Sequence, residues 1–307
     1  MQGIVIKSTG SWYMVRKEDG SIVSCRIKGK FRLSGIKHTN PITVGDVVEF
    51  DLEPSNQNGV IHKIQERKNY IIRKANNLSK QTHIIAANID QAMLMVTLAF
   101  PKTSLGFIDR FLMTAEAYHI PATIVFNKVD LFSNEMEDLL DDTIALYQNN
   151  IGYPCIKTSV KNNIGLDEVK EFLKDKTTLV SGHSGVGKSS LLNAIEPELN
   201  IKTGDISSYS FKGQHTTTFA EMHPLSFGGY IIDTPGIREF GLVDFNDAEI
   251  SHYFKEMKGF IGKCKFNNCK HMNEPNCSII KAVEEHLISA ERYQSYLSIM
   301  NNDDIYE

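Results

Sequence analysis

The sequence lacks long apolar runs and is poor in cysteine. No segment holds the roughly 18 consecutive apolar residues of a membrane-spanning helix. The first ten residues lack the apolar stretch and cleavage site of a secretory signal. Five cysteines in 307 residues are too few, and odd in number, for a secreted disulfide framework. We therefore expect a cytoplasmic protein with no membrane segment.

The sequence also lacks internal repeats and low-complexity tracts. Its composition, 41% hydrophobic and 23% charged with 21 glycines and 9 prolines, is that of ordinary globular proteins. This excludes a collagen-like, coiled-coil or wholly disordered chain. The length predicts about two domains and leaves room for a small third one.

Positive charge is concentrated in the first quarter of the chain. Up to Lys74 there are 13 Lys and Arg against 7 Asp and Glu, whereas the remainder has 20 against 30. A basic segment on an acidic body favours a polyanionic partner, nucleic acid above all. A solvated basic surface without a partner explains the charge equally well.

Residues 1–74 read as short strands joined by turns, with apolar and polar residues alternating and Asp-Gly and Asn-Gly at the turns. The expected strands are Gly3–Ser8, Trp12–Arg16, Ser21–Ile27, Val47–Leu52 and Val60–Ile64. Five short strands predict a small closed β-barrel of the OB-fold type. Such barrels often bind RNA, but the fold alone does not establish that function.

Residues 75–245 alternate apolar strands with amphipathic helices. The expected strands are Gln91–Leu98, Pro121–Phe126, Tyr153–Thr158, Thr177–Val180 and Gly229–Ile232. The expected helices are Ser104–His119, Asn134–Gln148, Gly165–Leu173 and Lys188–Ile195. This rhythm predicts an α/β domain with a parallel sheet covered on both faces. Residues 246–307 form a third, helical unit with a helix near Ser278–Ile299.

A phosphate-binding motif follows one of these strands and opens the next helix. The segment Gly182-His183-Ser184-Gly185-Val186-Gly187-Lys188-Ser189, continued by Ser190, fits G-x-x-x-x-G-K-[ST]. Glycines let backbone N–H groups surround phosphate oxygens, and the helix N-terminus adds its positive dipole end. Lys188 would reach the β- and γ-phosphates, and the Ser189 hydroxyl would ligate Mg²⁺.

A second motif, Asp233-Thr234-Pro235-Gly236, ends the strand Gly229–Ile232. In a phosphate-loop protein a carboxylate at this place is suited to the Mg²⁺ shell, and the Gly236 N–H to the γ-phosphate. Taken alone, this string is a common turn.

Two further motifs at strand ends predict a guanine site. In Asn127-Lys128-Val129-Asp130 the amide can serve the acceptor edge of guanine, and the carboxylate can accept from both of its ring donors. Adenine lacks that donor pair, so it would leave Asp130 unpaired. The Lys128 stem can pack on the base. The segment Thr158-Ser159-Val160-Lys161, which also follows a strand, resembles the accessory guanine loop, in which the Val160 N–H reaches O6.

The order of these motifs is unusual. In ordinary GTPases the phosphate loop comes first and the base motif last, whereas here the base motifs precede the phosphate loop. Strands need spatial adjacency rather than a fixed chain start, so the sheet can still assemble. The sequence therefore predicts a circularly permuted GTPase domain that binds GTP and GDP with Mg²⁺.

The C-terminal unit contains a metal-ligand cluster. Cys264, Cys269, His271 and Cys277 supply three thiolates and one imidazole within 14 residues. Such a set fits one tetrahedral Zn²⁺ in a closed structural site. A unit of about 60 residues has a small core, so metal binding would contribute to its folding.

These motifs together resemble the ribosome-small-subunit-dependent GTPase A family (RsgA) along essentially the whole chain. The resemblance implies a barrel (1–74), a permuted GTPase domain (75–245) and a zinc-binding domain (246–307). It further implies GTP hydrolysis stimulated by the small ribosomal subunit, a role in late subunit maturation, and contact of the barrel and zinc unit with 16S rRNA. We expect a monomer.

The catalytic residue is assigned by the same resemblance. Many GTPases place Gln after the DxxG motif, but here that position is Ile237, which cannot orient water. The segment containing Gln214 and His215 resembles the family's switch sequence GRHTTT, with Gln in place of Arg. It implies that His215 positions the water and that Thr217, among three threonines, ligates Mg²⁺. A surface histidine in a loop is the alternative reading of His215.

Two other functions remain open on the sequence. Because Ile237 leaves basal chemistry weak, the chain can be a nucleotide-gated rRNA-binding module whose hydrolysis is incidental. A phosphate-loop ATPase is the second alternative, against which Asn127 and Asp130 argue.

Overall fold

The computed structural model describes residues 1–27, 41–53, 58–74, 82–201, 220–233 and 246–301. The chain divides into two compact units. The first comprises residues 1–92, 169–181 and 189–243, and the second comprises residues 93–168, 182–188 and 244–307. The division passes through one strand and two helices, so it does not coincide with the motif boundaries of the sequence.

The first unit begins with a five-stranded barrel. Its strands are β1 (Gln2–Ser8), β2 (Tyr13–Arg16), β3 (Ile22–Ile27), β4 (Val47–Leu52) and β5 (Gly59–Ile64). They follow the order β1-β2-β3-β5-β4, and β4 also pairs with β1, which closes the barrel. The alternation seen in the sequence turns one face of each strand inward.

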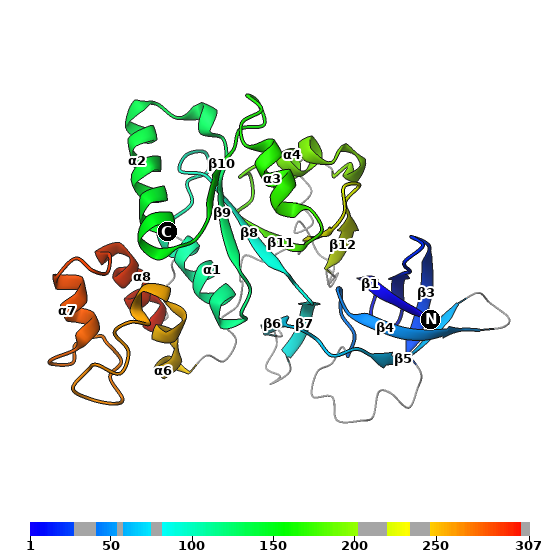
Figure 1. Cartoon of the computed structure of the whole chain (residues 1–307), viewed down its shortest axis with the longest axis horizontal. Helices are drawn as coiled ribbons and strands as arrows, with labels where there is room; N and C mark the ends of the chain where they lie inside the picture. The colour runs from blue at the N-terminus through cyan, green and yellow to red at the C-terminus, as the bar shows by residue number, and fades with distance from the viewer. Residues whose placement is uncertain (28–40, 54–57, 75–81, 202–219, 234–245, 302–307) are drawn as a thin grey trace, which may run out of the picture. The chain divides into compact units, whose positions relative to one another are not determined.

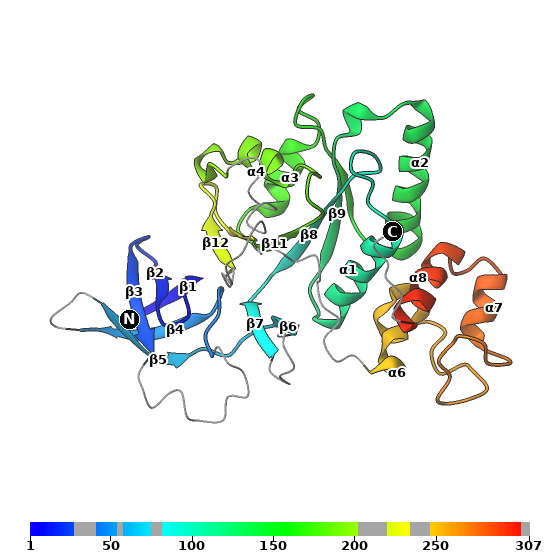
Figure 2. The same cartoon turned by 180° about the vertical axis from the view of Figure 1, so that it is seen from behind.

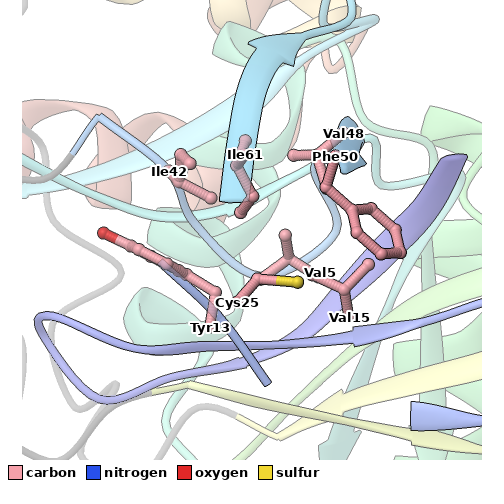
Figure 3. Close-up of a cluster of buried hydrophobic side chains, with 8 residues drawn as sticks. All are labelled: Val5, Tyr13, Val15, Cys25, Ile42, Val48, Phe50 and Ile61. Carbon is pink, nitrogen blue, oxygen red and sulfur yellow. The ribbon is translucent and has the colours of Figure 1, made fainter. Parts of the chain in front are cut away.

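The barrel core is apolar and fully enclosed. Figure 3 shows its eight buried side chains gathered in one interior. They are Val5, Tyr13, Val15, Cys25, Ile42, Val48, Phe50 and Ile61. The predicted N-terminal barrel is thereby confirmed.

The first unit contains further strands outside the barrel. Strands β11 (Thr177–Ser181) and β13 (Tyr230–Asp233) pair in parallel, and β12 (Glu221–Pro224) pairs antiparallel with β13. Strand β12 also pairs with β1, where Lys7 lies opposite Glu221 and forms a 3.0 Å ion pair with it. A separate hairpin consists of β6 (Tyr70–Lys74) and β7 (Thr82–Ala87).

The second unit contains the strands that carry the base motifs. In the order β10-β9-β8 they are β10 (Cys155–Lys157), β9 (Ala122–Phe126) and β8 (Gln91–Val96), of which residues 93–96 belong to this unit. All five residues of β9 are buried, as expected of an inner strand of a covered sheet. The backbone N–H of Asn127 donates to Val96, so the base motif begins beside the end of β8.

Helices connect these strands. They are α1 (Leu105–Ala117), α2 (Asn134–Ile144), the π-helix η3 (Ala145–Ile151), α3 (Leu166–Leu173) and α4 (Lys188–Ile195). Short 3-10 turns cover Val129–Leu131 and Pro197–Leu199. The N-terminus of α1 is capped by the Ser104 hydroxyl, which accepts from the Phe107 N–H at 3.3 Å.

The C-terminal part of the second unit is helical. It contains α6 (Asp247–Ile250), 3-10 turns over Ser251–Tyr253 and Lys255–Met257, α7 (Ser278–Glu284) and α8 (Ala290–Met300). Helix α8 lies beside α1 in both views (Figures 1 and 2). None of the described helices combines the length and apolar character needed to cross a membrane.

Two helix predictions need correction. The single helix near Ser278–Ile299 is wrong, because α7 ends at Glu284 and His286 adopts a left-handed backbone with φ 58°. A new helix then starts where the Ser289 hydroxyl accepts from the Arg292 N–H at 3.3 Å. The helix predicted over Asn134–Gln148 is α-helical only to Ile144 and continues as a π-helix. The fold class itself is confirmed: a barrel, an α/β GTPase-type core and a helical Cys/His unit.

Candidate functional site

The phosphate loop lies between β11 and α4. Its glycines Gly182, Gly185 and Gly187 have φ angles of 145°, 82° and 99°, which side-chain-bearing residues rarely adopt. A Cβ on Gly182 would lie 2.3 Å from the Met95 carbonyl oxygen, and one on Gly187 would lie 2.4 Å from Asn127 Nδ2. Only glycine therefore permits this path and the close approach to its neighbours.

Asn127 joins the base motif to the phosphate loop. Its side chain is buried, and its Nδ2 donates to the Val186 carbonyl oxygen at 2.8 Å. Its Oδ1 accepts from the Thr158 hydroxyl at 3.0 Å. The amide is thus fixed from both sides, and the orientation of its second N–H is set before any ligand arrives.

Lys128 adds a second connection of the same kind. It has a left-handed backbone with φ 62°, and its Nζ donates to the carbonyl oxygens of Phe100 at 2.8 Å and Gly185 at 2.7 Å. The ammonium therefore holds the loop after β8 and the phosphate loop together.

Asp130 is oriented by the second base segment. The Ser159 hydroxyl donates to Asp130 Oδ1 at 2.5 Å and accepts from the Asn162 N–H at 3.2 Å. The Val129 N–H donates to the Thr158 carbonyl oxygen, so the two segments run side by side. Val160 follows Ser159 at the turn that closes on Ile164. The structure thus brings both predicted base segments and the phosphate loop together within the second unit.

The remaining loop residues occupy the start of α4. Lys188 is its first residue, and its Nζ lies 2.6 Å from the Gly182 carbonyl oxygen and 2.8 Å from that of His183. This places the ammonium at the loop where the phosphates of a nucleotide would bind. Ser189 is buried and Ser190 exposed on the first turn of α4, within the first unit. The backbone of Asp233 ends β13, in register with Val180 of β11.

Several predicted residues lie outside the described part of the chain. These are Gln214, His215, Thr217, Gly236 and Ile237. Their roles in water positioning, Mg²⁺ binding and γ-phosphate contact remain predictions.

The four predicted metal ligands come together in the C-terminal unit. The donor atoms of Cys264, Cys269, His271 and Cys277 all lie within 4.8 Å of one another. His271 Nδ1 lies 3.4 Å from Cys264 Sγ and 3.3 Å from Cys277 Sγ, and those two sulfurs are 3.9 Å apart. A tetrahedron with Zn–S of about 2.3 Å and Zn–N of about 2.0 Å has edges of about 3.5 to 3.8 Å. The cluster has the size of a tetrahedral metal site.

The ligand loop is held by its own polar contacts. The Glu274 carboxylate accepts from the N–H groups of Lys270 at 2.6 Å and Met272 at 2.9 Å. Burial alone would raise the pKa of Glu274, but these N–H donors lower it to about 2. Tyr293 donates to the His271 carbonyl oxygen at 2.7 Å, and burial lowers the pKa of His271. The hydrogen bonds hold the loop in place. The lowered pKa of His271 favours the neutral imidazole, which is the form that binds metal.

Two contributors to these sites were not predicted from the sequence: the Phe100 carbonyl, which anchors Lys128, and Glu274, which braces the metal loop. Thr158 is the first residue of the predicted accessory guanine segment, and the structure adds that its hydroxyl fixes the Asn127 amide. No sequence motif marks Phe100 or Glu274, whose contacts depend on loop conformation.

Comparison with solved structures places this site in a known architecture. A structure of YjeQ from Thermotoga maritima superimposes with a TM-score of 0.78 at 36% identity, covering 98% of this chain and 97% of that one. A structure described as YloQ, a circularly permuted GTPase, superimposes with a TM-score of 0.74 at 31% identity, covering 98% and 94%. Together with the motif order, the fold and site define a circularly permuted GTPase.

Sequence comparison gives the family. The family described as RsgA GTPase matches residues 64–243, and the RsgA N-terminal domain matches residues 2–61. A small ribosomal subunit biogenesis GTPase RsgA from Phocaeicola vulgatus is 56% identical over 302 residues, covering 98% of this chain and 97% of its own. The chain belongs to the RsgA GTPase family.

Proposed function

We propose that this protein is a GTPase that acts on the small ribosomal subunit during its maturation. One observation carries the proposal: Asn127 and Lys128 of the base motif hydrogen-bond directly to Val186 and Gly185 of the phosphate loop. Two motifs that are far apart in sequence are therefore adjacent, which supports the proposal that they bind opposite ends of one guanine nucleotide. The relatives named as small ribosomal subunit biogenesis GTPases supply the biological setting.

Guanine recognition is assigned to the base segments. The Asp130 carboxylate accepts from the guanine N1–H and 2-amino group, the Asn127 amide serves the acceptor edge, and the Val160 N–H reaches O6. The hydrogen bond from Ser159 supports this role, because it fixes the carboxylate in one rotamer. Val129, the third residue of the Asn127–Asp130 motif, joins the two base segments through its N–H, which donates to the Thr158 carbonyl oxygen.

Phosphate and Mg²⁺ binding are assigned to the loop and its neighbours. The backbone of residues 182–190 surrounds the phosphates, and Lys188 neutralises the β- and γ-oxygens. Ser189, Asp233 and Thr217 would hold Mg²⁺, which offsets the charge that develops on the transferred phosphoryl group. Gly236 would contact the γ-phosphate.

Hydrolysis is assigned to His215. The residue after the DxxG motif is Ile237, whose side chain has no hydrogen-bonding atom for the attacking water. An imidazole can accept from that water. Slow basal turnover and strong stimulation by the small subunit follow if binding to the subunit places His215 against the nucleotide.

The Cys/His cluster is proposed to hold one Zn²⁺. Three thiolates and an imidazole leave no open coordination position, so the ion would stabilise the fold and would not take part in chemistry. The spacing of the donor atoms supports this assignment. The ion would hold residues 264–277 in one loop that leads into α7.

The proposed partners are the small subunit, with its 16S rRNA, and GTP or GDP. The basic first quarter and the exposed Trp12 and Met14 on the barrel support an RNA contact there. We further propose that the protein acts as a cytoplasmic monomer.

Turnover measured against defined partners tests this function. GTP hydrolysis is followed with small subunits, large subunits and naked rRNA at equal concentrations. Stimulation by small subunits alone supports a subunit-activated enzyme. Equal, low turnover in all reactions would instead favour a nucleotide-gated RNA-binding module.

A further inference from the structure

A buried ionic cluster joins α8 of the C-terminal part to α1. The side chain of Arg292 on α8 is completely buried. Its guanidinium donates to Asp109 Oδ1 of α1 at 2.6 Å and, through two nitrogens, to Glu256 at 2.6 and 3.1 Å. The Tyr147 hydroxyl donates to the same Asp109 oxygen at 2.6 Å. Four segments of the second unit thus meet at one guanidinium.

The buried charges of the cluster do not balance. It holds two carboxylates and one guanidinium, and Asp109 Oδ2 has no hydrogen-bond partner among the described residues. Burial and the Asp109 charge raise the pKa of Tyr147, which stays neutral. Buried ion groups of this kind often contribute less stability than apolar residues of similar volume would. Their hydrogen bonds are directional, however, so they favour the observed arrangement of α8 on α1.

The opposite side of α1 contacts the phosphate loop. The Phe107 ring lies 3.9 Å from the His183 ring, centroid to centroid, at an interplanar angle of 32°. Phe107 and Asp109 are two residues apart, so their side chains point about 200° apart around the helix. One turn of α1 therefore touches the phosphate loop on one side and the Arg292 cluster on the other.

We propose that Arg292 is a positioning residue that links α8, through α1, to the phosphate loop. Nucleotide binding fixes the loop and with it His183 and Phe107, and the hydrogen-bonded backbone of α1 passes this restraint to Asp109 and Arg292. By linkage, a partner that fixes α8 changes the binding free energy of the nucleotide by the same amount that the nucleotide changes the binding free energy of that partner. The proposal rests on the proposed function for its nucleotide and deepens it by naming a route between the two sites.

The test uses hydrogen exchange on the full-length, metal-loaded protein, without nucleotide and with GDP. In the wild-type protein we expect GDP to slow exchange in α8 by a factor of about 5 or more, the lower range of allosteric couplings. The triple variant Arg292→Met with Asp109→Leu and Glu256→Leu replaces all three charged groups of the cluster by apolar side chains, so that no buried carboxylate is left unpaired, and should lose this response while still binding GDP. The matched control is Lys258→Met, which removes the ion pair of Lys258 with Glu116, a residue of α1. In this variant GDP should slow exchange in α8 as it does in the wild-type protein.

A second variant covers the case in which the triple variant does not fold. Phe107→Leu keeps the ionic cluster but removes the ring contact with His183, and it should also lose the response in α8. The proposal is overturned if GDP leaves α8 exchange unchanged in the wild-type protein, or if the response persists in either folded variant. Failure of the proposed function is separate: it appears as wild-type turnover that small subunits do not stimulate.

Discussion

The Asn127 amide donates to the carbonyl oxygen of Val186, 59 residues further along the chain, at 2.8 Å. This hydrogen bond connects the end of β9 with the phosphate loop and is accompanied by that of Lys128 to Gly185. A base-recognition side chain that also supports the phosphate loop makes the two halves of the site interdependent. Damage to either half should therefore weaken binding of the whole nucleotide.

Changing Asp130 to Asn should alter base preference. The amide keeps the shape of the carboxylate but accepts at only one atom, and its N–H₂ faces the guanine donors. We expect GDP affinity to fall by about 100-fold or more, consistent with leaving buried polar groups unpaired. Xanthosine diphosphate, which carries an oxygen at C2, should bind better than GDP. Titration with both nucleotides checks this, and unchanged GDP affinity would remove Asp130 from the base site.

Thr158 should contribute through Asn127. Replacing it with Val removes the hydroxyl that donates to Asn127 Oδ1 and keeps the side-chain shape. The loss of one buried hydrogen bond, about 1 kcal/mol, corresponds to GDP binding about fivefold weaker. Thr143→Val is a matched control, since the Thr143 hydroxyl donates within α2, to the Leu139 carbonyl oxygen at 2.6 Å. Equal affinities for both variants would mean that the Asn127 amide needs no support from Thr158.

His215 should affect turnover rather than binding. His215→Ala should keep wild-type GTP affinity and lose most of the turnover stimulated by small subunits, on the order of 100-fold for the loss of a positioned base. Fluorescent-nucleotide binding and steady-state hydrolysis give the two quantities. Wild-type stimulated kcat in this variant would exclude the role.

The metal site should hold about one equivalent of Zn²⁺. Cys269→Ser removes one ligand and should lower the bound metal to well below half an equivalent and destabilise the C-terminal helices. Glu274→Ala leaves all four ligands but removes the acceptor that holds the loop, so we expect metal release about 10- to 100-fold faster. Elemental analysis and chelator competition measure both effects. Full metal content in the Cys269→Ser protein would show that the cluster is not the site.

Sequence patterns predicted the strands best where the residues alternate regularly between apolar and polar or form one continuous apolar run. The barrel strands follow alternation, and β8, β9 and β11 follow buried apolar runs, so their positions were predicted to within a few residues. Strand β12 was not predicted, because the polar segment Glu221–Pro224 becomes a strand by pairing with β1 and β13. Pairing between distant segments is a tertiary effect that local patterns do not encode. The β6–β7 hairpin was also missed, although its two strands are neighbours in the sequence, so the reason given for β12 does not apply to it.

In the candidate site, too, the sequence predicted the residues that follow a fixed pattern and missed contacts made by residues outside one. Each motif was visible because its chemistry requires particular residue types at fixed spacing, and the structure brings the described ones together. The residues that support them, Glu274 and Arg292, act through contacts with distant or non-regular segments. Arg292 would ordinarily be placed on a solvent-facing side of its helix. Only the structure shows that it is buried among carboxylates.

A titration of the nucleotide-free protein with GDP and with ADP tests most directly whether both motifs bind one guanine nucleotide. We predict saturable binding of one GDP per chain and ADP at least about 1,000-fold weaker, since adenine leaves the buried polar groups of the base site unpaired. Asn127→Ala should weaken GDP binding by affecting both the base and the phosphate loop. Equal affinities for GDP and ADP, or GDP binding unaffected by this substitution, would contradict the account.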